Sequence, residues 1–234
     1  MPDFPQDPKQ STFDAPIELS KFVVFDTELT GLNPRSGQII SIGAITINCL
    51  KIIPHESFYS VVRPEGAMIS TATFVHRITP ENLVNAPSIE EILPRFVEFC
   101  GDSILVGHQL EIDLPFLRKA CRKALRSTIS NPFVDTLRLA RCCKTKIRDI
   151  GTTKSVNEIS YNLGRLSRLL DLPLFPQHDA LGDALQTAYL LLKLIWILKN
   201  EGISSCRELC VMGSPSWLQA CLLRWGIKNN CPMR

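Results

Sequence analysis

The sequence predicts an α/β domain built on a mixed five-stranded sheet flanked by helices. Three segments rich in β-branched and aromatic residues occupy the first third of the chain, before any helical pattern begins. Two further strand-like segments then alternate with helices, as in parallel βαβ units. With 234 residues, of which 45% are hydrophobic, the chain can bury a sizeable core. We therefore expect one compact domain with appendages.

The first strand is expected to begin near Lys21. Residues 1–19 contain four prolines among polar residues and no sustained apolar period, which is typical of a flexible N-terminal arm. The run KFVVFD at 21–26 is suited to a central strand buried on both faces, and the glycines, asparagine and proline of 31–37 indicate a turn after it. Two more strands are predicted at 39–47 and 57–62, separated by Pro54 and His55.

Helices and strands alternate in the rest of the domain. Ser88 and Glu91 have the spacing of a capping box at the start of the first of these helices. The predicted elements are helix 88–100, strand 103–107, helix 112–127, strand 132–137, a helix from Thr136, a loop at 144–161 and a long helix at 182–200. We therefore assign residues 20–200 to the domain. Residues 201–234 form a C-terminal helical extension whose Trp217 and Trp225 are expected to pack back on the domain.

Composition bears on the possible partners and the cellular compartment of the protein. The net charge of +3 and the pI near 8.4 permit a polyanionic partner but do not indicate one by themselves. The nine cysteines form no CxxC pair, and together with the absence of a signal peptide this favours reduced thiols in the cytoplasm, with zinc binding by the last four as the alternative. The apolar run 185–198 is shorter than the roughly 20 residues that span a bilayer, so we expect a buried helix and no membrane partner.

Two acids lie at the end of the first predicted strand. Asp26 and Glu28 are two residues apart, so strand alternation sends both carboxylates to one face while Thr27 points away from them. Hard divalent cations prefer such oxygen ligands. A pair of solvated acids at a strand end is the alternative interpretation.

Two more acids stand at predicted helix starts. Asp113 and Asp183 could be ordinary N-terminal helix acids, or they could project into the same site as the strand acids. Four carboxylates in one pocket repel strongly, and two divalent cations would relieve that repulsion. His178 lies five residues before Asp183, and an imidazole with its ordinary pKa of about 6.5 is suited to accept a proton at neutral pH.

These residues carry a family resemblance. The stretches FDTELTGL, GHQLEIDLPFL and HDALGDA, with VHRIT between the first two, resemble the motifs of the DnaQ-like, or DEDDh, 3′–5′ exonucleases over about Lys21–Leu198. Among these enzymes the chain is most similar to the proofreading epsilon subunit of bacterial DNA polymerase III. The resemblance implies a ribonuclease H-like fold and His178 as the general base. It implies metal binding by Asp26, Glu28, Asp113 and Asp183.

The same resemblance implies contacts to the substrate. Thr30, Gly31 and Leu32 would form a floor and a wedge for the terminal nucleotide, His76 would line the site, and Phe116 would stack near the penultimate base. The alternatives are an ordinary core role for Leu32 and a local backbone contact for His76. The chain departs from the family pattern at two positions, with Gln109 in place of the usual Asn and Arg77 in place of Gly, which puts substrate preference in doubt. We expect His108 to support the site from behind.

The function expected from the resemblance is metal-dependent 3′–5′ exonuclease activity. Such an enzyme, with two divalent cations (Mg²⁺ or Mn²⁺), would release nucleoside monophosphates from single-stranded 3′ ends, with DNA favoured over RNA, in proofreading or repair. Proofreading would require a separate DNA polymerase subunit as partner. The alternatives are an RNA-trimming exoribonuclease, a catalytically silent nucleic-acid-binding module of the same fold, and an HD-type phosphohydrolase suggested by the dipeptide His178-Asp179. The last is disfavoured because that fold is all helical.

Overall fold

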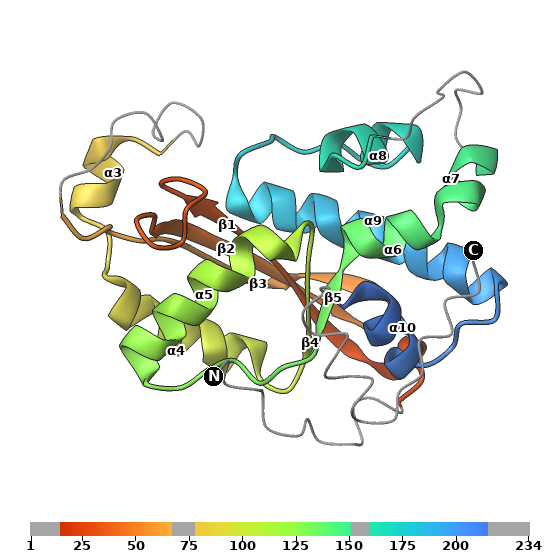
Figure 1. Ribbon diagram of the computed structural model, residues 1–234, viewed down its shortest axis with the longest axis horizontal. Helices are drawn as coiled ribbons and strands as arrows, with labels where there is room; N and C mark the ends of the chain where they lie inside the picture. The colour runs from red at the N-terminus through yellow and green to blue at the C-terminus, as the bar shows by residue number, and fades with distance from the viewer. Residues whose placement is uncertain (1–14, 67–77, 151–159, 215–234) are drawn as a thin grey trace.

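The computed structural model describes residues 15–66, 78–150 and 160–214, and within these residues the centre of the protein is one five-stranded sheet (Figure 1). The order of the strands in the sheet is β3-β2-β1-β4-β5. β1 and β2, and β2 and β3, pair antiparallel, whereas β1 and β4, and β4 and β5, pair parallel. The strands are β1 Lys21–Leu29, β2 Ile39–Asn48, β3 Lys51–Val61, β4 Ile104–Gly107 and β5 Phe133–Asp135. The predicted mixed five-stranded sheet is therefore confirmed.

The edge strand β3 begins earlier than the sequence suggested. Cys49 and Leu50 both have positive φ angles, of 48° and 57°, and they form the tight turn that joins β2 to β3. Pro54 and His55 lie inside the strand instead of before it. Proline is tolerated here because β3 is at the edge of the sheet and its register with β2 shifts opposite Ile45 and Thr46.

Helices cover both faces of the sheet. α4 and α5 pack on one face, where Phe25, Phe96 and Leu117 belong to one hydrophobic cluster. α9 crosses the other face, with α6, α8 and α10 around it (Figure 1). The helices are α3 Pro80–Val84, α4 Ile89–Cys100, α5 Leu110–Leu125, α6 Thr136–Cys142, α7 Lys144–Ile150, α8 Leu163–Leu169, α9 Ala180–Asn200 and α10 Cys206–Gly213, and a 3-10 turn, η1, spans Ile17–Leu19.

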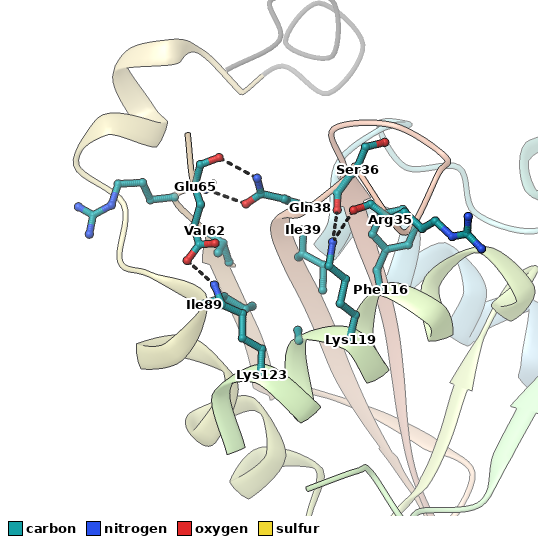
Figure 2. Close-up of a pocket in the computed structure, with 13 residues that line it drawn as sticks. Arg35, Ser36, Gln38, Ile39, Val62, Glu65, Ile89, Phe116, Lys119 and Lys123 are labelled. Carbon is teal, nitrogen blue, oxygen red and sulfur yellow. Dashed lines mark hydrogen bonds and ion pairs between the residues drawn. The ribbon is translucent and has the colours of Figure 1, made fainter. Parts of the chain in front are cut away.

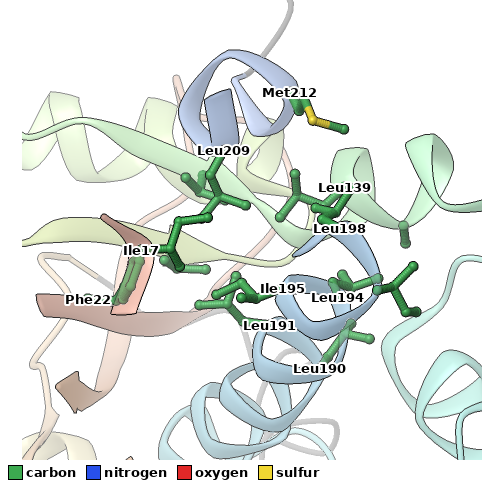
Figure 3. Packing of buried hydrophobic residues seen from close by; sticks show 14 of the residues in the cluster. Ile17, Phe22, Leu139, Leu190, Leu191, Leu194, Ile195, Leu198, Leu209 and Met212 are labelled. Atoms are coloured by element: carbon green, nitrogen blue, oxygen red, sulfur yellow. The ribbon is translucent and has the colours of Figure 1, made fainter. Parts of the chain in front are cut away.

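α9 is the central helix of the second cluster. Its residues Leu191, Ile195 and Leu198 are buried beside Phe22 of β1 and Ile17 of η1, as Figure 3 shows. Among the described helices α9 alone is long and apolar enough, by length and composition, to cross a membrane. Its buried residues instead provide the core under the sheet, which agrees with the buried helix expected from the sequence.

Three local expectations need correction. The capping box at Ser88 does not form, because the Ser88 side chain makes no capping bond to the helix. The end of the expected N-terminal arm belongs to the fold, since Ile17 is fully buried and its N–H donates to the Ser204 carbonyl at 3.0 Å. The expected loop at 144–161 begins with the helix α7. The rest of that loop, at 151–159, lies outside the described residues, as do Trp217 and Trp225.

The described cysteines are all free thiols. Five of them are buried, and Cys206 and Cys210 lie in the core on α10, where the Cys206 thiol donates to the Ser20 hydroxyl at 2.9 Å. Burial raises the pKa of Cys206. The remaining two residues of the zinc alternative, Cys221 and Cys231, lie outside the described residues.

Candidate active site

The strand β1 presents two carboxylates on the face that α9 covers. Asp26 is opposite Gly43 of β2, and Gly43 is opposite Tyr59 of β3, so these three positions form one row across the sheet. A Cβ on Gly43 would lie 2.2 Å from backbone atoms of Ala180 and Leu181, so the absence of a side chain lets the start of α9 lie directly against the sheet. Glu28 is one step further along the same face, with 5% of its surface exposed.

Asp113 reaches this site from α5. β4 pairs with β1 only as far as Val24, so beyond that point this edge of β1 has no strand neighbour and the first turn of α5 lies there. Thr27 Oγ1 donates a hydrogen bond to Asp113 Oδ1 at 2.5 Å, and both residues are buried. Thr27 points away from the two strand acids, as predicted, and from the other face of β1 it joins the third acid to the strand.

Asp113 is not the cap of its helix. The carboxylate of Asp135, at the end of β5, accepts hydrogen bonds from the backbone N–H groups of Gln109 at 2.9 Å and Leu110 at 3.2 Å. The same carboxylate accepts from Leu137 N at 2.9 Å, so Asp135 serves the first turns of both α5 and α6. This leaves Asp113 to face the strand acids.

The start of α9 brings the fourth acid and the histidine. Asp179 caps the helix by accepting from Gly182 N at 3.0 Å. The carboxylate of Asp183, in the first turn, accepts from the backbone N–H of His178 at 2.9 Å. His178 has a left-handed φ of 61°, which folds the chain back toward the helix start. One ligand atom each from Glu28, His178 and Asp183 lies within 4.8 Å of the others.

The acids strongly disfavour one another's charge. Burial raises the pKa of Asp26 well above its usual range, and the charges of Asp113, Asp183, Glu28 and Asp179 raise it further. Burial, followed by Asp183, Asp113 and Asp179, raises the pKa of Glu28 to about 8. The pKa of Asp113 rises to about 6 because of burial, and its hydrogen bond from Thr27 opposes that rise. Burial also raises the pKa of Asp183.

This donor set fits hard divalent cations. Four carboxylates that converge on one pocket cannot all be ionised cheaply unless positive charge is placed among them. Carboxylate oxygen is the ligand that Mg²⁺ and Mn²⁺ prefer, and Glu28, His178 and Asp183 already group within the reach of one ion. The arrangement can therefore hold a metal, and it places an imidazole at its open edge.

Two residues near the acids were given no role from the sequence. Asp179 adds negative charge beside Asp26 and Glu28, besides capping α9. Tyr59, on the edge strand, is 47% exposed; burial raises its pKa, and the charges of Asp179 and Glu28 raise it further. The position of Asp179 before a predicted helix was a usable capping signal, whereas Tyr59 could be found only from the register of β2 and β3.

The loop after β1 presents the predicted substrate residues. Thr30 is held to Gln38 by two hydrogen bonds, one between backbone groups and one to its hydroxyl, each 2.9 Å long. Gly31 and Leu32 are exposed, and Leu32 has 76% of its surface accessible, so the core interpretation of Leu32 is wrong. His76 and Arg77 lie outside the described residues.

The side chains of Phe116 and His108 are both packed within the protein. The Phe116 ring is 2% exposed and packs beneath Gly37, so it presents no open face to a base. His108 contacts the Thr136 hydroxyl and the Tyr161 carbonyl, each at 2.9 Å, and burial lowers its pKa to about 4. His108 therefore links the end of β4 to α6 as a neutral imidazole, and the supporting role expected for it stays a prediction.

Comparison with known proteins identifies the family of this chain. A family model described as an exonuclease (RNase T) matches residues 23–191. The PolC-type DNA polymerase III of Thermotoga petrophila is 34% identical over 198 residues, which cover 85% of this chain and 14% of that protein. A DNA polymerase III subunit epsilon-like protein of Rhodobacter capsulatus is 32% identical over 193 residues, which cover 82% of this chain and 26% of that protein. The matched part of the chain thus spans 14% and 26% of the length of these two relatives.

A solved structure shares the fold. Exonuclease X in complex with 5′ overhanging duplex DNA has a TM-score of 0.60 and 24% sequence identity, and the match covers 82% of this chain and 99% of that one. The sheet order and the flanking helices are those of the ribonuclease H-like fold. That fold excludes the all-helical HD-type phosphohydrolase. With the family model matched over most of its length, the chain belongs to the RNase T/DnaQ-like exonuclease family and is related to the exonuclease domains of DNA polymerase III epsilon and PolC.

Proposed function

We propose that the chain is a metal-dependent 3′–5′ exonuclease that releases nucleoside monophosphates from single-stranded DNA 3′ ends. The observation that carries the proposal is the convergence of carboxylates from β1, α5 and α9 with His178 at their edge. Burial and the neighbouring carboxylates raise the pKa of Asp26 and of Glu28, and bound divalent cations would offset the cost of ionising them.

Each residue has a separate task in this proposal. Two bound divalent cations would supply activation of a water molecule and stabilisation of the leaving oxygen. The residues that would hold them are Asp26, Glu28, Asp113 and Asp183. His178 would accept the proton of the attacking water, because it lies exposed at the edge of the acids and close to Glu28 and Asp183. Thr27 would fix Asp113 through its hydrogen bond.

The loop after β1 would hold the end of the strand. Thr30 and Gly31 would support the terminal nucleotide, and the exposed Leu32 would act as the wedge against its base. His76, beyond the described residues, keeps its proposed place in the lining of the site. Phe116 would meet a base only if the loop that carries Gly37 moved, because the ring is buried beneath it.

DNA is the favoured substrate, and a polymerase subunit is the proposed partner. The relatives matched over most of this chain are named as DNA polymerase III proteins, and exonuclease X was solved with DNA. A role in proofreading or repair would follow. Discrimination against RNA would depend on contacts to a 2′-hydroxyl. The exoribonuclease remains the second candidate.

The test is a time course with single-stranded DNA and RNA of the same sequence, each labelled at the 5′ end. We expect stepwise shortening from the 3′ end in Mg²⁺ or Mn²⁺, faster on DNA, and none after chelation. Asp26→Ala should abolish shortening and leave the fold intact, because removing one acid relieves repulsion in the metal-free protein. Shortening of RNA alone would establish the exoribonuclease, and intact strands under every condition would favour the silent binding module.

A further inference from the structure

A pocket lies next to the loop that follows the strand acids. This pocket, with a volume of about 190 Å³, opens between the loop after β1, the end of β3 and α5 (Figure 2). Its floor is apolar and its rim is basic. The floor consists of Ile39, Val62, Ile89, Phe116 and Ala120, and the cations of the rim are Arg35, Arg63, Lys119 and Lys123.

The walls of the pocket are tied together by polar contacts. The Gln38 amide exchanges two hydrogen bonds with the backbone of Glu65, each 2.7 Å long. The Lys119 ammonium donates to the carbonyls of Pro34, Arg35 and Gly37 at 2.9, 3.3 and 3.2 Å, which fastens the loop to α5, as Figure 2 shows in part. These bonds join three separate segments, so the pocket is formed before any ligand arrives.

The rim keeps positive charge available. Lys123 is paired with the carboxylates of Glu65 and Glu90, and Lys119 is engaged by the loop. Within the described residues, no carboxylate pairs with the guanidinium of Arg35 or of Arg63, and both side chains are exposed. Because guanidinium groups bind phosphate in a bidentate manner, these two arginines are suited to phosphates at the edge of the pocket.

The loop after β1 and the helix α5 each carry residues of both the active site and the pocket. Thr30, two residues after Glu28, is bonded to Gln38 in the pocket wall. Phe116 lies one helical turn after Asp113, and the α5 side of the pocket then runs from Phe116 to Lys123. That stretch is about 10 Å long at the helical rise of about 1.5 Å per residue. A strand whose 3′ end lies at the acids can therefore pass over this pocket.

We propose that this pocket, the upstream pocket, binds one nucleotide of the substrate strand on the 5′ side of the residues at the active site. The volume is below the roughly 300–1,000 Å³ of sites for drug-sized ligands, so it suits one base, with sugar and phosphates at the rim. The base lies against Ile89 and Ala120, the half-buried apolar residues of the lining, and Arg35 and Arg63 pair with phosphates of the strand. The proposal rests on the proposed function, because it assumes a strand whose 3′ end lies at the acids.

The experiment measures strand binding by fluorescence anisotropy in Mg²⁺, with the Asp26→Ala background preventing shortening. Strands of two and of eight nucleotides are compared, because only the longer one reaches the upstream pocket. Arg35→Ala combined with Arg63→Ala should weaken binding of the long strand by roughly 10-fold at low salt, and should lower the salt slope by about 0.7 for each lost phosphate contact. Binding of the dinucleotide should change by less than about twofold.

Two further variants separate charge from shape. Ala120→Phe fills the pocket without changing the charge, and it should weaken binding of the long strand while leaving the salt slope unchanged. Arg95→Ala, at an exposed arginine on α4 outside the pocket, is the matched control and should bind as the parent does. Thermal unfolding shows whether the Ala120→Phe variant folds. If it does not, the double arginine variant tests the proposal by itself.

The proposal is overturned if the double arginine variant binds the long strand with the parent affinity and salt slope. It is also overturned if the long and the short strand lose affinity equally, because the arginines would then act at the active site. Failure of the proposed function is recognised separately. A protein that shortens no strand in the time course can still show length-dependent binding, because anisotropy requires no turnover.

Discussion

Thr27 and Asp113 lie 86 positions apart in the chain, and a hydrogen bond of 2.5 Å from the Thr27 hydroxyl joins them inside the protein. Alternation along β1 puts Thr27 on the face shared with Phe25 and Leu29, which α5 covers. The residue between the two strand acids therefore holds the third acid from the opposite side of the strand. One β-strand thus controls the positions of three carboxylates.

Replacing Thr27 with Val should weaken metal binding. Valine keeps the shape of threonine and removes the donor, so the Asp113 carboxylate loses the bond that orients it and favours its charge. We expect the affinity for Mn²⁺, measured by isothermal titration calorimetry, to fall by about 10-fold. Thr27→Ser keeps the donor and should keep most of the affinity. Equal affinities of the Val variant and the parent would show that the bond has no part in metal binding.

The stability of the metal-free protein should fall as pH rises. The pKa of Glu28 is about 8 in the folded protein and 4.5 without the fold, so between these values the folded state binds more protons than the unfolded state. Stability then decreases with rising pH, because ΔG of unfolding decreases wherever the folded state holds the excess protons. The raised pKa of Asp26 acts in the same direction. Urea unfolding in chelator at pH values from about 5 to 8 measures the slope.

Comparison with Glu28→Gln isolates the effect of this carboxyl group. The contributions of the titratable groups that both proteins share largely cancel in this comparison. The free energy of unfolding of the variant relative to the parent should therefore rise from about pH 5 to about pH 8. Added Mg²⁺ should stabilise the parent more at pH 8 than at pH 5, since its ligands must be ionised. Parallel pH profiles for parent and variant would contradict the assigned burial of Glu28.

Replacing His178 with Ala should depress cleavage without abolishing metal binding. His178 lies at the edge of the acids, and an enzyme that loses its general base loses rate by roughly 100-fold or more. Single-turnover cleavage at neutral pH and Mn²⁺ affinity are the two measurements. His55→Ala, at an exposed position on the edge strand, is the control and should cleave as the parent does. Unchanged turnover in the His178 variant would assign the proton transfer to another group.

Short-range sequence patterns predicted the sheet. The site was predicted only in part, because some of its contacts arise from long-range packing. Runs such as KFVVFD and SILVG fixed the strands because apolar strands buried on both faces are recognisable locally. The extension of β3 through Pro54 was missed, because proline is tolerated there only as a result of the edge position and the register shift. Thr27 and Tyr59 lie near the acids only because elements distant in sequence pack together. Strand alternation alone cannot show such contacts.

Gly43 tests whether the close approach of α9 to the sheet positions the site. A Cβ at residue 43 would lie 2.2 Å from both the Ala180 carbonyl carbon and the Leu181 nitrogen, which are backbone atoms and cannot rotate away. Gly43→Ala should therefore push the first turn of α9 outward and cost about 2–4 kcal/mol of stability in urea unfolding. Asp179, Asp183 and the preceding His178 would move with that turn, so cleavage should fall together with stability. Gly31→Ala is the stability control, because a Cβ there meets nothing within 4 Å. If Gly43→Ala were as stable and as active as the parent, the contact between α9 and β2 would not set the position of the fourth acid.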